Sequence, residues 1–279
     1  MAFFHSIFRC STTYHGPDGK YLTSGLEYET LALLGTNLGL VDPDVVAKLD
    51  RLCDDMGLDT IETGSAIGVT AQAGKMTFGD ADSGYALFDE LEKGTEFGNI
   101  LGNGVVATCK ALGITRIPAY KGQAIPAHDP RVSKATGVTY KTSPMGADHT
   151  AGVSYEKFKY AEGQVERSLN VQIMSAAIDN LGYCSLARIG DNKLFFELAR
   201  DLLNARFGLS LEVDDLINIG RETLKQELEF NKGSEFYTAH DPDPEFVKTE
   251  VQPPVGLVFD VDEAEIAAIW DKLDTAEPV

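Results

Sequence analysis

The chain has 279 residues, of which 43% are hydrophobic and 24% are charged, and it carries a net charge of −19. This composition is typical of a globular protein with a sizeable core, and the acidic charge argues against nucleic acid and anionic membranes as partners. No apolar run approaches the roughly 20 residues that a membrane-spanning helix needs, and the first ten residues lack a signal-peptide pattern, so we expect a cytoplasmic protein.

The sequence is dominated by helical patterns. The first, residues 41–57, has Asp42 in the N-cap position, Pro43 in the first turn and Gly57 just after the last apolar residue, as is usual at helix ends. Apolar residues at helical spacing predict four further helices, over residues 162–182, 191–208, 211–231 and 260–274. Strand-like alternation is sparse and short, so the predicted fold class is mainly α.

Three loops rich in Gly, Pro or Asp interrupt these patterns, at residues 15–25, 114–138 and 240–256. The middle loop also contains basic residues, which makes it the best candidate for a domain boundary, near residue 118. We therefore expect one helical domain over residues 1–118 and a second over residues 119–279.

Two of the helical patterns end on related hexapeptides. The first motif is "DDMGLD", Asp54 to Asp59, and the second motif is "DNLGYC", Asp179 to Cys184. A helix C-terminus carries a partial negative charge, so a carboxylate in its last turn is disfavoured by roughly 0.3–1 kcal/mol. Either these are solvated Asp residues before ordinary C-cap glycines, or they accept hydrogen bonds from a ligand. A fused heterocycle with amino and ring N–H groups would suit two such carboxylates.

The paired Asp-x-x-Gly motifs resemble those of the tungsten-containing aldehyde ferredoxin oxidoreductase family. Further stretches are similar to this family in the same order: "GLEYETLALLGTNLGL", "LDTIETGSAIGV", "KGQAIPAHDPR", "TSPMGADHTAG" and, near the end, "PPVGLVFDVDEAEI". The resemblance covers essentially the whole chain. It implies two packed helical domains like domains 2 and 3 of the family, without the N-terminal β domain of full-length members.

The resemblance also implies a cofactor, a tungsten or molybdenum bispterin. In this family each motif holds one of the two pterins. Carried over to this sequence, the residues expected at the first pterin are Asp54, Gly57, Leu58 and Asp59, and those at the second are Asp179, Gly182 and Tyr183.

Three residues are catalytic candidates for oxidation of an aldehyde to an acid, a reaction that needs a titratable group beside the metal. His149 lies in the Gly-rich stretch "GADHTAG" and matches the histidine that the family places near tungsten. Glu29 matches the family's active-site glutamate, and Glu27 is the alternative, because both stand in "LEYET". Without a function, these acids would be an ordinary pair at a helix N-terminus, and His149 a polar loop residue.

The cysteines depart from the family pattern. Cys53 and Cys109 fall in apolar helical stretches and are expected in the core. Cys184 matches one ligand of the family's 4Fe–4S cluster and Cys10 another, but Ser6 stands where a further cysteine is expected. Two thiolates are too few for a cluster that takes four cysteine ligands.

Two hypotheses follow. In the first, the chain is the C-terminal part or subunit of an oxidoreductase that passes electrons from an aldehyde, through a cluster, to ferredoxin or a similar acceptor. It would then work together with a separate chain that carries the β domain, or as a homo-oligomer. Alternatively, the true N-terminus would lie upstream and the protein would include that domain itself. In the second, the chain is a truncated, non-catalytic paralogue that serves as a binding or assembly module.

Overall fold

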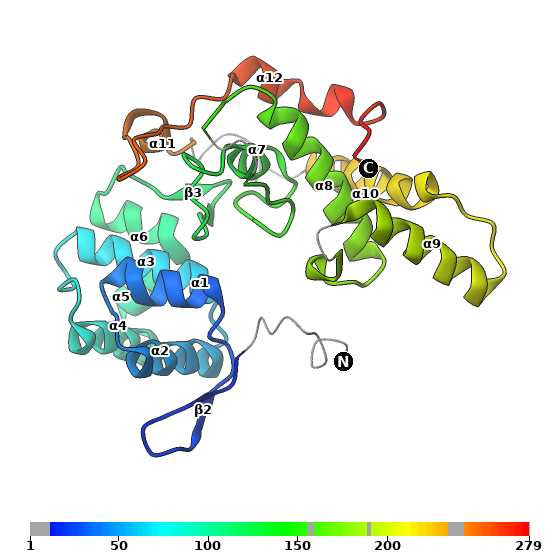
Figure 1. Ribbon diagram of the computed structural model, residues 1–279. Coiled ribbons are helices and arrows are strands. Elements are labelled where there is room, and N and C mark those ends of the chain that lie inside the picture. The colour runs from blue at the N-terminus through cyan, green and yellow to red at the C-terminus, as the bar shows by residue number, and fades with distance from the viewer. Residues whose placement is uncertain (1–11, 156–158, 189–190, 234–242, 279) are drawn as a thin grey trace. The chain divides into compact units, whose positions relative to one another are not determined.

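A computed structural model describes residues 12–155, 159–188, 191–233 and 243–278 (Figure 1). Contacts divide the chain into two units, Met1–Ala127 and His128–Val279. This division falls later than the boundary expected near residue 118, because the hairpin that follows residue 118 pairs within the first unit and packs on its helices. Each unit is mainly helical, which confirms the predicted fold class.

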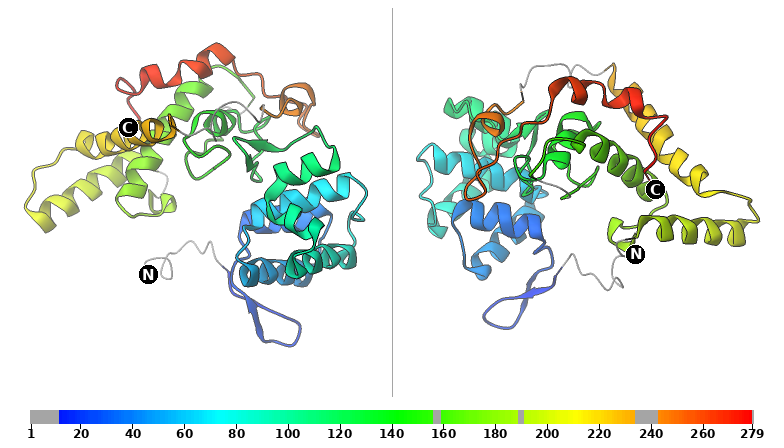
Figure 2. Two further views of the ribbon diagram at one scale, coloured as in Figure 1. Left: turned by 180° about the vertical axis from the view of Figure 1, so that it is seen from behind. Right: turned by 45° about the horizontal axis from the view of Figure 1, so that its top comes forward.

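The first unit combines two short hairpins with a group of helices. Its strands are β1 (Tyr14–His15), β2 (Tyr21–Thr23), β3 (Ala119–Tyr120) and β4 (Gln123–Ala124), which form two antiparallel pairs. Its helical elements are α1 (Tyr28–Thr30), the π-helix η2 (Leu31–Gly35), the 3-10 helix η3 (Thr36–Leu38), α2 (Pro43–Met56), α3 (Thr60–Gln72), α4 (Ala81–Lys93), α5 (Glu96–Gly102) and α6 (Gly104–Leu112). The β1–β2 hairpin extends away from these helices in all three views (Figures 1 and 2).

Side-chain hydrogen bonds to free backbone N–H groups mark the starts of helices in this unit. The carboxylate of Asp42 accepts a hydrogen bond from a backbone N–H in the first turn of α2, as predicted, and Asp80 caps α4 in the same way. The core gathers apolar residues of η2, α2, α3 and α4, among them Leu34, Leu49 and Ile67. These contacts hold η2 and α2 against α3, the helix that follows the first motif.

The π-helix lies directly on α3. A Cβ atom added at Gly64 of α3 would meet the carbonyl carbon of Leu33 at 2.6 Å, so only glycine permits this approach. The Asn37 side-chain amide donates to the Gly64 carbonyl at 3.2 Å and ties the following 3-10 helix η3 to α3 as well. π-Helical turns are rare and often occur at functional sites, and this one begins two residues after Glu29.

The second unit is mainly helical in its described part. Its elements are α7 (Lys134–Thr142), α8 (Gln164–Asn180), the 3-10 helix η4 (Ser185–Arg188), α9 (Asn192–Phe207), α10 (Val213–Asn231), α11 (Phe246–Thr249), α12 (Glu263–Ala267) and the 3-10 helix η6 (Ile269–Lys272). Helices α9 and α10 are joined by a short loop and form a hairpin (Figure 2). In the described residues, no helix is long and apolar enough to cross a membrane.

Helix α8 is the centre of this unit, and apolar residues along it, among them Leu169, Ile173 and Ile178, are buried. It packs on α7 and α10. Gly220 brings α10 so close to α8 that an added Cβ would lie 2.2 Å from the Ile173 carbonyl oxygen. Between α7 and α8, the Gln172 amide donates to Thr142 and Ser168 hydroxyls at 3.0 Å each, so buried polar groups join these helices.

Several details of the sequence-based prediction were wrong, since the expected loops at residues 15–25 and 240–256 contain β2 and α11. Residues 114–138 were expected to be a loop, but α7 already begins at Lys134, whose buried side chain pairs with Asp260. Residues 260–274 were expected to form one helix, but α12 ends at Ala267 and a 3-10 turn follows. The apolar residues Ile266, Ile269 and Leu273 are nevertheless buried, so the pattern located the packed face correctly.

Candidate functional site

The first motif ends α2 in a defined hydrogen-bond pattern. Gly57 adopts a left-handed conformation with φ of 68°. Its N–H donates to the Asp54 carbonyl at 3.2 Å, and the Leu58 N–H donates to the Cys53 carbonyl at 2.9 Å. This pair of bonds is the Schellman motif, in which glycine is favoured because other residues are strained at positive φ.

The second motif repeats this geometry at the end of α8. Gly182 has φ of 71°, its N–H donates to the Asp179 carbonyl at 2.9 Å, and the Tyr183 N–H donates to the Ile178 carbonyl at 3.2 Å. The two motifs therefore agree bond for bond and not only in sequence. In both, the N–H of the residue after glycine is used inside the motif, which leaves the carboxylate side chain as the group able to bind a ligand.

The last residue of each motif precedes a new helical element. The Asp59 carboxylate accepts the Glu62 N–H at 2.7 Å and caps α3. Cys184, a half-buried free thiol, stands immediately before η4. The cap gives Asp59 a structural role that the sequence comparison of the motifs did not suggest.

The charge around the second motif is unfavourable for a lone carboxylate. Desolvation, together with the nearby Asp148 carboxylate, raises the pKa of Asp179 above its ordinary value. Desolvation and Asp179 in turn raise the pKa of Glu227 on α10. Within the described part of the chain, no group donates a hydrogen bond to the side chain of Asp179, nor to that of Asp54 at the matching position. Both residues are exposed, so water solvates the two carboxylates, and a ligand with N–H donors would replace that water.

The glutamate candidates lie at the start of α1. Glu27 is the exposed N-cap residue, whereas Glu29 is 8% exposed. The Glu29 carboxylate accepts the Ala127 N–H at 2.6 Å, and the neighbouring Tyr28 hydroxyl donates to the Ala127 carbonyl at 3.1 Å. Glu29 is therefore a buried, fixed carboxylate, and of the two it has the surroundings of a positioned functional group.

The same segment is joined to the first motif. The hydroxyl groups of Thr30 and Thr60 are 3.0 Å apart and hydrogen-bonded. Thr30 follows Glu29, and Thr60 follows Asp59, so this bond brings the glutamate segment and the end of the first motif together within the first unit. The sequence resemblance named these residues separately; their association comes from the packing of α1 on α3.

His149 lies in the loop that links α7 to α8, and it is half-buried. Its ring centroid is 4.9 Å from that of His128, whose Nδ1 is 2.9 Å from the Tyr155 hydroxyl. The Tyr140 hydroxyl also donates to the His128 carbonyl, at 3.1 Å. His128 was given no role from the sequence, although it stands in the family-like stretch "KGQAIPAHDPR", which was the available signal.

The loop of His149 is held in place from both ends. The Ser143 hydroxyl bonds to both backbone groups of Gly146, and Asp148 accepts the backbone N–H and the hydroxyl of Thr150 at 2.8 Å. A Cβ atom added at Gly152 would lie 3.1 Å from the Gln172 nitrogen on α8, so the loop packs tightly on that helix. The position of His149 is thereby fixed within the second unit.

The cysteines separate into two classes. Cys53 and Cys109 are fully buried in the first unit, as predicted, and burial raises the pKa of the first thiol to about 12 and of the second to about 11. Thiols of this kind are poor metal ligands, because the ligand is the thiolate. Cys184 is accessible in part. Cys10 and Ser6 lie outside the described residues.

Comparison with known families agrees with this geometry. The sequence model of one family, described as "Aldehyde ferredoxin oxidoreductase, domains 2 & 3", matches residues 5–264. The chain belongs to this family. The relation recognised from the two motifs is therefore confirmed, and it extends over nearly all of the sequence, including the glutamate segment and the loop of His149.

Several curated proteins are similar to this aldehyde ferredoxin oxidoreductase family member. The tungsten-containing aldehyde ferredoxin oxidoreductases of Pyrococcus furiosus and Thermococcus kodakarensis are 27% and 26% identical to it, and each comparison covers 75% of this chain and 38% of the relative. The aliphatic sulfonate oxidoreductase WOR-like subunit of Pyrococcus furiosus is 25% identical over 71% of this chain and 35% of its own length. The chain thus spans less than two fifths of the length of these relatives.

Proposed function

We propose that this chain is part of an oxidoreductase that converts aldehydes to carboxylic acids at a tungsten or molybdenum bispterin centre. The observation that carries the proposal is the bond-for-bond equivalence of the two motifs, each of which presents an Asp carboxylate with no donor among the described residues. The names of the relatives supply tungsten and the substrate class, and the resemblance of the two motifs to pterin-binding motifs supplies the bispterin.

The bispterin centre, when bound, supplies the two-electron oxidation. The chain's own residues would hold the pterins by accepting hydrogen bonds: Asp54 and Asp59 for one pterin, and Asp179 for the other. A pterin that donates N–H bonds to Asp179 would also stabilise its charged form, which desolvation and Asp148 now disfavour.

Proton handling would fall to His149 and Glu29. Oxidation of an aldehyde with water to a carboxylic acid releases two protons for every two electrons, so a group that accepts protons is required. Imidazole exchanges protons near neutral pH, and His149 is fixed by its loop. Glu29 is fixed by the Ala127 N–H and would orient water or substrate, with Glu27 as the exposed alternative.

An iron–sulfur cluster does not fit the cysteines of this sequence. With Cys53 and Cys109 in the core, only Cys10 and Cys184 are left as ligands, and a 4Fe–4S cluster requires four thiolates. A cluster, and ferredoxin as electron acceptor, would therefore need cysteine ligands beyond this sequence, from a partner chain or from residues upstream of Met1. We derive no step through the cluster.

A second candidate function is a non-catalytic binding or assembly module. The specific observation in its favour is the cysteine set, in which Ser6 replaces an expected ligand. Such a module would keep the helical scaffold and the caps that stabilise it, and would contain neither tungsten nor iron.

Metal analysis separates the two candidates. Tungsten, molybdenum and iron per polypeptide are measured by mass spectrometry on protein purified anaerobically from its own source. We expect about one tungsten or molybdenum per chain, lost when Asp54 and Asp179 are both changed to Asn. About four iron atoms in addition would require cysteines from a partner chain or from a longer true N-terminus. Protein without tungsten or molybdenum would refute the catalytic proposal and support the module.

A further inference from the structure

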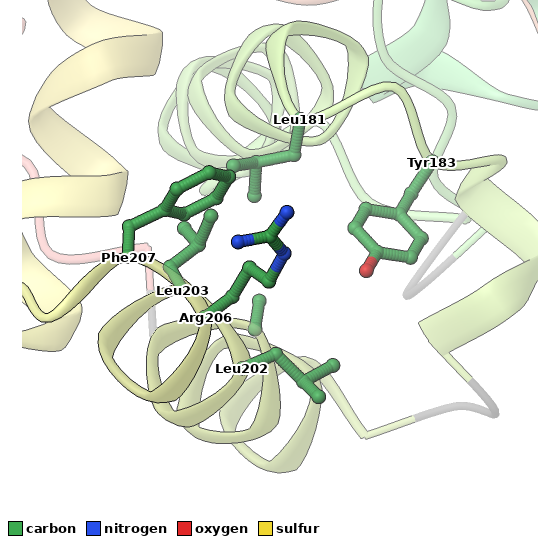
Figure 3. A pocket seen from close by; sticks show the side chains of 7 residues that line it. Leu181, Tyr183, Leu202, Leu203, Arg206 and Phe207 are labelled. Atoms are coloured by element: carbon green, nitrogen blue, oxygen red, sulfur yellow. The ribbon is translucent and has the colours of Figure 1, made fainter.

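A surface pocket of the second unit lies between the end of α8 and the last turns of α9, with a volume of about 350 Å³ (Figure 3). We call it the α9 pocket. Its wall is mainly apolar, and the residues labelled in Figure 3 are Leu181, Tyr183, Leu202, Leu203, Arg206 and Phe207.

One cation enters this apolar pocket. Figure 3 shows the Arg206 guanidinium extending among the surrounding side chains, and its central carbon is 5.1 Å from the centroid of the Phe207 ring. Within the described ranges, Arg206 forms neither an ion pair nor a hydrogen bond. Arg200, one and a half turns earlier on α9, pairs with Asp201 at 2.8 Å. The guanidinium N–H groups of Arg206, unlike those of Arg200, are therefore available to bind a ligand.

The apolar side chains of the pocket are unusually accessible. Leu202 is 60% exposed, Phe207 62% and Tyr183 43%. Contiguous exposed apolar surface is uncommon on soluble proteins and marks binding sites when polar residues surround it. An Arg fork binds a carboxylate through two parallel hydrogen bonds. A ligand that combines an apolar body with one carboxylate would match both features.

We propose that the α9 pocket binds an unbranched aliphatic monocarboxylate, with its carboxylate on Arg206 and its chain along Leu202, Phe207 and Tyr183. A volume of about 350 Å³ is at the lower end of the range for small-ligand sites, which are mostly apolar with a few polar groups that fix orientation. Tyr183 belongs to the second motif as well as to this pocket, so the site borders the proposed position of the second pterin, but its carboxylate would be held by Arg206, which lies outside that motif.

The overall negative charge of the protein does not prevent such binding. The chain carries −19 in total, but at 0.1 M salt charges beyond about 10 Å are largely screened. The field at the pocket is then set mainly by groups close to Arg206. A neutral ligand of equal length measures the apolar contribution alone, so comparison with the acid isolates the effect of the guanidinium.

The test is calorimetric titration of the purified full chain with hexanoate, octanoate and decanoate below their micelle concentrations, and with octan-1-ol. We expect affinity to increase about threefold to fourfold for each added methylene until the pocket is filled. Octanoate should bind about tenfold or more tightly than octan-1-ol, because hydrogen bonds between charged partners exceed neutral contacts.

Variants connect this preference to Arg206. Arg206→Gln should reduce octanoate affinity about tenfold or more and leave octan-1-ol unchanged, and Arg206→Lys should recover part of the loss. Arg200→Gln, on the same helix, is the matched control and should bind octanoate as the wild type does. Circular dichroism verifies that each variant is folded, which we expect because Arg206 is exposed.

Two results would overturn the proposal. Equal affinity for octanoate and octan-1-ol, or an unchanged affinity in Arg206→Gln, would mean that the pocket attracts apolar molecules without recognising a carboxylate. A dimer in sedimentation analysis that Leu202→Asp abolishes would mean that a second copy of the chain covers the pocket.

Discussion

Asp59 has two roles that a pair of substitutions can separate. Its carboxylate caps α3 by accepting the Glu62 N–H at 2.7 Å, and it is a proposed pterin ligand at the end of the first motif. Alanine removes both capacities. Asparagine keeps an oxygen that can cap the helix and removes only the charge, so we expect the two variants to differ in stability but not in cofactor content.

The magnitudes follow from the contacts. Replacing an N-cap Asp by Ala costs about 1 kcal/mol, whereas Asn is as good a cap as Asp. Asp59→Ala should therefore lower the melting temperature of the first unit by roughly 2–8 °C, the range for a domain of about this size, and Asp59→Asn by much less. Hydrogen bonds to a charged group contribute about 1.5–3 kcal/mol, so either variant should weaken pterin binding about 10- to 150-fold.

Thermal unfolding followed by circular dichroism measures the first effect, and tungsten or molybdenum per chain in anaerobically purified protein measures the second. Asp80 is the matched control, because it caps α4 by accepting the Ser83 N–H at 3.1 Å and lies outside both motifs. Asp80→Ala should cost similar stability without changing metal content. Full metal content in Asp59→Asn would refute the cofactor role and leave Asp59 as a helix cap only.

Three further predictions concern the rest of the chain. Gly220→Ala should lower stability by about 1–3 kcal/mol, since the new Cβ would lie 2.2 Å from a carbonyl oxygen of α8; Gly84→Ala, whose Cβ has ordinary contacts, should not lower the melting temperature. The pKa of Asp179 is raised in the fold, so its charged carboxylate lowers the free energy of unfolding above that pKa, and this effect disappears as the pH falls through it. Asp179→Asn should therefore be more stable than the wild type at pH 7 and lose this advantage in acid. Iodoacetamide should label Cys184 faster than the two buried cysteines, whose thiols have pKa values of about 12 and about 11; equal rates, read by mass spectrometry, would contradict their burial.

The long helices were predictable because their ends carry local chemistry. Asp42 and Gly57 limit α2 in the structure at the positions that their sequence context indicated. The break between α12 and η6 was not predictable, because Ile266 and Ile269 satisfy helical spacing while the backbone changes to a 3-10 turn. Side-chain spacing specifies which residues face the core, but not which hydrogen-bond pattern the backbone adopts.

Contacts between distant segments were beyond the sequence. The sequence suggested no role for Glu62, yet its carboxylate accepts the Val105 N–H at 2.7 Å and the Ala124 N–H at 2.9 Å. Burial raises its pKa even against these two bonds. No pattern along the chain reports such a partner 43 or 62 residues away, because the contact exists only once α3, α6 and the β3–β4 hairpin have packed.

The residues of the two motifs differ in how strongly they indicate a bound cofactor. Asp59 would persist in a non-catalytic paralogue, because α3 needs its cap, and Gly57 and Gly182 would persist because of their positive φ. Asp179 has no such reason: it caps no helix, its residue is exposed, and desolvation and Asp148 raise the pKa of its carboxyl. Retention of Asp179 as a carboxylate is therefore the stronger sign of a bound donor, and its substitution by Asn, neutral or stabilising in the isolated chain, should be costly only where a pterin is bound.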